Sequence, residues 1–112
     1  MQRIKESEQP FRAGALSGVK YLMRGPRIDW GVILLLPGEK LGGHYHHEVE
    51  ETFYILEGEG SLIVNDSETP AVPGDVLRME VQDRHSIRNT GDKPLKLVFI
   101  KCPYLPDDKV DI

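Results

Sequence analysis

The sequence contains a single cysteine and no long apolar segment. With only Cys102 the chain cannot form an internal disulfide, which fits a reducing compartment. Cys102 closely follows the apolar run 95–100, so we expect a small buried thiol there rather than a catalytic nucleophile. No apolar run approaches the roughly 20 residues that span a bilayer, and the polar start MQRIKESEQP lacks the apolar core of a signal peptide. These absences predict a cytoplasmic protein with no membrane partner.

The chain also lacks an excess of positive charge. It has 14 Lys and Arg residues against 18 Asp and Glu residues, which gives a net charge of -4. Binding to the phosphates of nucleic acids needs a basic stripe, and none is visible. We therefore expect no nucleic acid partner.

Turn-forming residues are abundant in this short chain. Its 112 residues suffice for one domain with a single core, and its 11 glycines and 8 prolines indicate many turns between short elements. Residues 1–18 show no sustained period and are interpreted as an N-terminal arm or a short edge strand. Residues 19–112 are interpreted as one all-β domain without a helix of convincing length.

Roughly seven or eight short strands are expected. Residues 28–36 form a continuous apolar run that stops at a Pro-Gly turn, so we expect a strand buried on both faces, in a barrel or at a subunit contact. Further strands are expected over 52–56, 61–64, 76–79, 86–89 and 95–100. This pattern is typical of a β-sandwich or a β-barrel.

The segment 38–58, GEKLGGHYHHEVEETFYILEG, gathers residues suited to metal binding. His44 and His46 are two positions apart, so on an extended strand both project from the same face. Glu51 follows as the next strand begins, and another histidine, His85, lies far downstream. Imidazoles combined with one carboxylate suit a divalent transition metal far better than Mg or Ca, which prefer oxygen ligands.

Strand alternation predicts an apolar neighbourhood for these side chains. Phe53 and Ile55 share the face of Glu51, and Ile87 shares the face of His85. The polar residues should therefore point into an interior that restricts water and lets a metal act strongly on a bound ligand.

At these positions the chain resembles the cupin family through two motifs. The first motif, G-x5-H-x-H-x4-E-x6-G, falls with every interval intact on Gly38, His44, His46, Glu51 and Gly58. The second motif, G-x5-P-x-G-x2-H-x3-N, falls with every interval intact on Gly74, His85 and Asn89. Glu80 and Gln82 stand where the second motif has proline and glycine, at positions that shape the loop before His85. The resemblance covers roughly residues 28–101.

The resemblance implies a small jelly-roll β-barrel that binds one divalent metal ion inside it. By this carry-over the metal ligands are His44, His46, Glu51 and His85, and Asn89 is structural or supports the ligands. The metal is one of Fe, Mn, Zn, Ni, Co or Cu. Six-coordination would leave two positions for water or substrate. A divalent ion with one carboxylate carries a formal charge of +1, which favours an anionic, chelating small molecule.

Members of the family include dioxygenases, decarboxylases, isomerases and lyases, so the fold does not choose the reaction. Our leading hypothesis is a metal-dependent enzyme that acts on a small carboxylate, enol or sugar-like substrate. The alternative is a barrel that binds or senses a small molecule without turnover, and a storage or structural role is a more distant one. No separate catalytic side chain and no organic cofactor are assigned. Single-domain members are commonly dimers, and the apolar run 28–36 with the loose arm predicts a homodimer.

The other polar and aromatic residues near the motifs are not expected to be metal ligands. His47 should face opposite His46, which makes exposure or support of the ligands its expected role. Solvated charges are expected at Glu48, Glu50, Lys96 and Lys101. Strand packing or surface exposure is favoured over a pocket role for Trp30, Tyr45, Tyr54 and Arg78.

Overall fold

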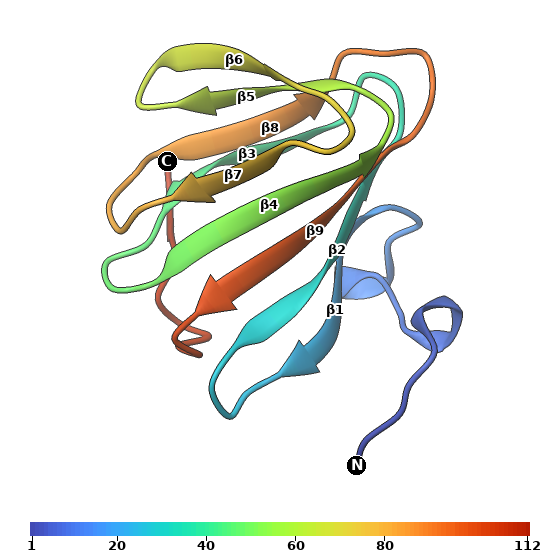
Figure 1. The fold of residues 1–112 in the computed structure, drawn as a ribbon, viewed down its shortest axis with the longest axis vertical. Coiled ribbons are helices and arrows are strands. Elements are labelled where there is room, and N and C mark those ends of the chain that lie inside the picture. The colour runs from blue at the N-terminus through green and yellow to red at the C-terminus, as the bar shows by residue number, and fades with distance from the viewer.

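The computed structural model describes residues 1–112 and consists almost entirely of strands and turns (Figure 1). The strands are β1 (Gly18–Arg24), β2 (Asp29–Leu35), β3 (Lys40–Tyr45), β4 (Glu50–Glu57), β5 (Gly60–Val64), β6 (Ser67–Ala71), β7 (Val76–Met79), β8 (His85–Asn89), β9 (Leu95–Cys102) and β10 (Val110–Asp111). None of the helices is long and apolar enough to cross a membrane.

The strands form two five-stranded antiparallel sheets, with the orders β1-β2-β9-β4-β7 and β10-β3-β8-β5-β6. Strands distant in the sequence lie side by side, because β9 enters between β2 and β4 while β8 enters between β3 and β5. The expected all-β jelly roll is thereby confirmed.

The hydrophobic core lies between the two sheets. It is formed by alternate side chains of the strands: Val19, Ile33, Leu35, Phe53, Ile55, Leu62, Ala71, Met79, Ile87, Leu95, Leu97 and Phe99. On β4 the buried face continues from Ile55 through Phe53 to Glu51, which is also buried. The inward-facing row of apolar residues thus leads directly to a buried carboxylate.

β6 and β10 carry no strand pattern in the sequence. β6 reads Ser-Glu-Thr-Pro-Ala, with only Ala71 buried, and it pairs with β5 at the edge of its sheet. Such a strand shows no apolar alternation, because its form depends on the backbone partner that β5 supplies. β10 is two residues long and pairs with the end of β3.

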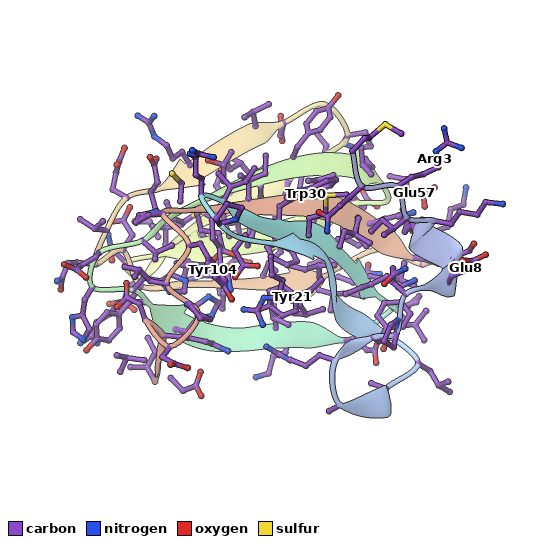
Figure 2. The ribbon with its side chains drawn as sticks, turned by 90° about the horizontal axis from the view of Figure 1, so that it is seen from below. Arg3, Glu8, Tyr21, Trp30, Glu57 and Tyr104 are labelled. Carbon is purple, nitrogen blue, oxygen red and sulfur yellow. The ribbon has the colours of Figure 1, made fainter.

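β2 buries side chains on both faces, as its apolar run predicted. The adjacent residues Val32 and Ile33 are both buried. Figure 2 shows Tyr21 and Trp30 on opposite sides of the β1–β2 edge, with Tyr21 toward the second sheet. The arm residues Gln2, Arg3, Ile4 and Glu6 lie beside Trp30 on the outer side. The chain itself therefore covers part of the outer face of β2.

The residues before β1 form an arm with two short 3-10 turns, η1 (Glu6–Glu8) and η2 (Arg12–Gly14), beside β1 (Figure 1). Lys20 Nζ donates to the carbonyl oxygen of Glu6 at 3.2 Å, and Lys96 Nζ pairs with the Glu6 carboxylate at 2.7 Å. These contacts hold the arm against the outer side of the first sheet. The division into an arm over 1–18 and a barrel domain over 19–112 stays a prediction.

Cys102 is exposed, so the expectation of a buried thiol is wrong. It is the last residue of β9, and its side chain alternates away from the face that carries the buried Phe99. The apolar run ends at residue 100, and β9 leaves the core by the position of Cys102.

The motif residues Asn89 and Gly58 support the end of the barrel away from the histidines. The Asn89 amide donates to the carbonyl oxygens of Leu35 and Lys93, at 2.8 Å each, and accepts from the Gly91 N–H at 2.9 Å. Gly58 has a φ of 82°, and a Cβ there would lie 2.3 Å from the carbonyl oxygen of Pro94. Asn89 is therefore structural, and position 58 requires glycine.

Candidate metal centre

A β-bulge in β3 aims His44 into the barrel. On β3 and β8, Leu41 lies opposite Ile87 and His44 lies opposite His85, so three residue steps on β3 match two on β8. The extra residue falls at positions 42–43, both glycine, and it reverses the alternation so that Leu41 and His44 both face inward. The bulge thus places two histidines directly across from each other.

His46 and Glu51 flank the loop that joins β3 to β4. His46 is the first residue after β3, and its carbonyl oxygen accepts the Gln82 N–H at 2.8 Å, which ties this loop to the one before β8. Gln82 has a φ of 71°, in the left-handed region that favours glycine, and glycine is the residue of the family motif at this position. The glutamine therefore occupies a backbone conformation for which the motif supplies glycine.

The four predicted ligand residues are buried and meet at one carboxylate oxygen. Glu51 Oε1 lies 3.0 Å from His85 Nε2, 3.3 Å from His46 Nε2 and 3.4 Å from His44 Nε2. The candidate ligand atoms all lie within 4.8 Å of one another. The structure thus brings together residues from both motifs, with three imidazoles on one sheet and its loop and the carboxylate on the other.

Each imidazole is oriented through its other nitrogen. Nδ1 of His44 contacts the carbonyl oxygen of Gly42 at 3.2 Å, and Nδ1 of His85 contacts that of Asp83 at 2.9 Å. Nδ1 of His46 contacts the carbonyl oxygen of Asp108. A carbonyl oxygen can only accept, so every Nδ1 must carry the proton and every Nε2 of a neutral ring presents a lone pair to the centre.

Asp108, in the C-terminal segment, braces the loop that follows His46. Its Oδ1 accepts the His47 N–H at 3.0 Å, and its Oδ2 accepts the N–H groups of Glu48 at 2.8 Å and Val49 at 3.0 Å. The same residue supplies the carbonyl that receives the His46 Nδ1 proton. No motif in the sequence points to Asp108, because it is 62 positions from His46 and meets it only in the fold.

The electrostatics of Glu51 show what this centre needs. Burial raises the pKa of Glu51, but hydrogen bonds from the rings of His44, His46 and His85 outweigh it and, with the charge of Lys101, hold that pKa well below its ordinary value. Those hydrogen bonds need a proton on each Nε2, whereas rings that present Nε2 lone pairs need a positive ion in place of those protons. An ionised carboxylate in this setting needs a positive group between its oxygen and the three nitrogens.

A divalent transition metal fits this donor set better than protons do. Three protonated rings would be crowded together, since the His44 and His85 ring centroids are 4.3 Å apart and those of His44 and His46 are 5.2 Å apart. With metal–ligand bonds of about 2.1 Å, neighbouring ligands at right angles lie about 3.0 Å apart. The contacts of 3.0 to 3.4 Å to Glu51 are close to that value. The residues are therefore able to hold one ion, with Nδ1 partners of the kind that orient metal-binding histidines.

A family model described as "Cupin domain" matches residues 31–101, which is more than half of the chain. The chain belongs to the cupin family.

Two curated relatives of this cupin match it over more than half of its length. It is 35% identical to Protein SchB of Streptomyces halstedii over 87% of the chain and 63% of that protein. It is 38% identical to an oxalate-binding protein of Thermotoga maritima over 59% of the chain and 54% of that protein. The cupin thus spans less than two thirds of the length of these curated relatives.

Solved structures agree on the fold. A conserved Klebsiella pneumoniae protein with a double-stranded β-helix domain superposes with a TM-score of 0.85, covering 99% of this chain and 96% of that one. The sequence identity is 17%, so this likeness concerns the fold alone.

A cavity of about 250 Å³ of empty space, mouth included, adjoins the four-residue cluster of this cupin. Its apolar walls include Ile33, Leu41 and Phe99, and its polar lining is formed by His44, Glu51, Arg12, Tyr21, Lys101 and Lys109. Glu51 is the sole carboxylate among these lining residues, which include three cations. Most of this space is open to solvent, and its enclosed part has room for about one water molecule.

The expectation that Lys101 is a solvated position is wrong. It lies opposite Glu51 on the neighbouring strand, continues the inward-facing row of Leu97 and Phe99, and lines the cavity. Alternation along β9 was a signal in the sequence that could have identified it. Lys96 is half-buried on the outer side and pairs with Glu6.

The remaining candidates lie outside the cavity. His47 and Glu48 are exposed in the loop after β3, and the His47 ring contacts Tyr45 with centroids 5.4 Å apart. Exposed side chains on β4 and β7 include Tyr54 and Arg78, and Arg78 lies beside Glu50 and Glu80. Trp30 lies on the outer face. The polar residues near the site that the sequence did not indicate are Arg12, Tyr21, Asp108 and Lys109.

Proposed function

We propose that this cupin is a metal-dependent enzyme for a small carboxylate, enol or sugar-like substrate, of the dioxygenase, decarboxylase, isomerase or lyase type. His44, His46, Glu51 and His85 would hold one divalent transition metal. The observation that carries the proposal is the convergence of three oriented Nε2 atoms on the buried Glu51 oxygen beside a small cavity. A bound ion would serve as a Lewis acid or as an oxygen-activating centre.

The cavity favours a substrate of negative charge. Arg12, Lys101 and Lys109 line it, although the whole chain carries a net charge of -4. Positive groups gathered around one opening attract anions and raise their local concentration. The name of the oxalate-binding relative supports a small carboxylate for this site as well.

The test combines metal content with turnover. Protein purified without an affinity metal column is analysed for its elements, and the His46→Ala variant is compared with the wild type and with His47→Ala, a control in the exposed neighbour. We expect a stoichiometric transition metal in the wild type and in His47→Ala, and its loss together with any activity in His46→Ala. Native protein without such a metal, together with an activity unchanged in His46→Ala, would refute the proposal.

The binding module remains the second candidate, and the name of the oxalate-binding relative favours it. In that case the same cavity would retain a small anion without converting it. Native mass spectrometry of the purified protein, followed by incubation with a broad substrate panel, separates the two functions. A retained ligand without any product supports the binding module, and product formation excludes it.

We also propose that the cupin forms a homodimer in the cytoplasm. Neighbouring outer side chains of β9, β4 and β7 leave an apolar surface exposed, with Tyr54, Val76 and Ile100 at 44%, 66% and 38% exposure. A second copy presents the same apolar surface, so a two-fold contact would match like with like. Light scattering at micromolar concentration should give the mass of a dimer, and Tyr54→Glu should give that of a monomer. A monomeric wild type contradicts this proposal.

A further inference from the structure

Both ends of the chain line the cavity beside the histidine cluster, but only one of them is joined to the barrel by backbone hydrogen bonds. Arg12 comes from the N-terminal arm, and Lys109 comes from the C-terminal segment. In the C-terminal segment β10 pairs with β3, and the Ile112 N–H donates to the Gly43 carbonyl oxygen at 3.1 Å. The backbone hydrogen bonds of residues 1–17 all stay within the arm, in its two 3-10 turns. The arm can therefore leave the barrel without breaking a sheet.

The arm passes round the edge strand β1 and is held there by a few side chains (Figure 1). On the outer face Glu6 meets two lysines, through its carbonyl oxygen with Lys20 and through its carboxylate with Lys96. The Lys20 ammonium also lies 4.5 Å from the centroid of the Phe11 ring. The side chains of the Lys96–Glu6 pair are 26% and 42% exposed, and pairs exposed to this degree contribute little to stability. The arm is thus fastened weakly.

The chain turns sharply between these contacts and β1. Ala13 and Gly14 have φ values of 60° and 69°, in the left-handed region, which alanine adopts only at a cost in free energy. Arg12 directly precedes this turn, is exposed, and makes no hydrogen bond or ion pair in the structure. Rotation at residues 13–14 would relieve the strain at Ala13 and carry Arg12 away from the cavity, so this turn is suited to be a hinge.

The space that the arm helps to enclose is too small for the proposed substrates. Its enclosed part has room for about one water molecule, whereas a carboxylate, enol or sugar-like molecule has several heavy atoms. An open groove adjoins it at Arg12 and Tyr21, and the other residues that line this groove are Pro10, Phe11, Ala13, Gly14 and Arg24. Most of the groove is therefore formed by the arm itself, and movement of the arm would join it to the cavity.

We propose that the N-terminal arm is a lid over the metal centre. It swings away from β1 at residues 13–14 to admit a molecule larger than water, and on closing it returns Arg12 to the mouth of the cavity. This inference rests on the proposed function, because a substrate has to reach the histidine cluster. It adds a conformational step that controls access to the cluster.

The first experiment measures the position of the arm without any metal. Trp30 is the only tryptophan of the chain, and the arm residues Arg3 and Glu6 lie beside it (Figure 2). Glu6→Gln removes the charge that pairs with Lys96 and keeps the carbonyl oxygen. We expect the open fraction of the arm to rise about 1.5- to 5-fold, the effect of one exposed ion pair, and acrylamide quenching of Trp30 fluorescence to rise with it. Glu8→Gln is the matched control, because Glu8 is an exposed acid of the same turn without an ion pair, and it should leave quenching unchanged.

The second experiment locks the arm. In a Cys102→Ser background, Glu6→Cys and Lys96→Cys are joined by a short bis-maleimide, and the same variant with both thiols capped by N-ethylmaleimide is the control. Azide, which has three atoms, is added to the Co(II)-loaded proteins, and the visible absorption of Co(II) reports the rate of its binding. We expect the tether to slow azide binding at least about 10-fold relative to the capped form, since a ligand binds only the open population. Glu6→Gln should speed azide binding about 1.5- to 5-fold.

The outcomes separate this inference from the proposed function. If Co(II) fails to bind the wild type, the proposed metal function is wrong, and the quenching comparison alone decides on the arm. If Co(II) binds but azide reaches it equally fast in the tethered and capped forms, or does not reach it in the capped form, the lid inference is wrong and the metal function stands. Equal quenching in Glu6→Gln and Glu8→Gln also overturns the inference. Thermal unfolding checks that each variant folds, and the Glu6→Gln comparison keeps the test valid if the double-cysteine variant does not.

Discussion

Replacing Asp108 by alanine should weaken both the fold and the metal centre. The Asp108 carboxylate accepts three backbone N–H groups of the loop 47–49, and its own carbonyl receives the proton of His46 Nδ1. The substitution keeps the carbonyl that accepts from His46 but removes the three carboxylate contacts that hold residues 47–49 against the C-terminal segment. The position of His46 relative to Glu51 therefore becomes less well defined.

The size of the effect follows from these contacts. A hydrogen bond to a charged group contributes about 1.5–3 kcal/mol when it is buried. Asp108 is only half-buried, and water can replace it as a partner of the loop amides. The three hydrogen bonds together should therefore contribute less to the free energy of unfolding than three times the value of one buried bond. We expect a loss of about 2–3 kcal/mol in the free energy of unfolding. Metal affinity should fall about 10- to 100-fold, which is typical when a partner that orients a ligand is removed.

The effect should depend on pH in a defined way. Burial raises the pKa of Asp108, but the backbone N–H groups of Glu48, His47 and Val49 outweigh it, so the folded-state pKa lies below the ordinary value of 3.8. A carboxyl whose pKa is lower in the folded protein stabilises it above the unfolded value, and the stabilisation is lost as pH falls through the folded value. The difference between the wild type and Asp108→Ala should therefore be constant from about pH 5 to 8 and shrink below 3.8.

The free energy of unfolding is measured by urea unfolding of metal-free protein, followed by the fluorescence of the single tryptophan, Trp30. Metal affinity is measured by titration against a chelating dye. Asp107→Ala is the matched control, because the exposed neighbour makes none of these contacts. Its stability should lie within about 0.5 kcal/mol of the wild type. If Asp108→Ala behaves like Asp107→Ala in both measurements, the C-terminal segment does not orient His46 and the reasoning is refuted.

Substitutions at three further positions test other parts of the structure. Glu51→Gln should reduce metal affinity at least about 100-fold in the same dye titration, since it removes the one anionic ligand, and an unchanged affinity would contradict the site. Gln82→Gly should stabilise the protein by about 0.5 kcal/mol in urea, because relief of the φ of 71° exceeds the entropy cost of glycine, while Gln82→Ala should give no gain. Gly58→Ala should cost at least about 2 kcal/mol, given a Cβ position 2.3 Å from the carbonyl oxygen of Pro94, and a stable variant would show that this turn rearranges freely.

Strands with an inward-facing apolar face were well predicted from the sequence. The expected strand over 76–79 coincides with β7, and the expected strands over 52–56 and 95–100 lie within β4 and β9. Their alternation reports burial directly, because every second side chain enters the core. β6 was not predicted and the burial of Cys102 was predicted wrongly, because an edge strand and a strand end are determined by their neighbours in space rather than by their own pattern.

The sequence by itself determined which residues form the candidate metal centre. His44, His46, Glu51 and His85 follow from the intervals of the two motifs, because those intervals reflect strand and turn lengths that bring the four side chains to one point. The turn positions of the two motifs follow in the same way. Gln82, for example, stands at a glycine position of the motif and has the left-handed backbone conformation that glycine favours.

Only the tertiary structure decided what surrounds that centre. Asp108 reaches His46 across 62 positions, Lys101 meets Tyr21 across 80, and Arg12 comes to the cavity from the N-terminal arm. None of these contacts leaves a pattern in the chain, since each depends on how the ends of the protein pack against the barrel. Local spacing specifies which residues are able to bind a metal, and long-range packing specifies which molecule is able to bind beside them.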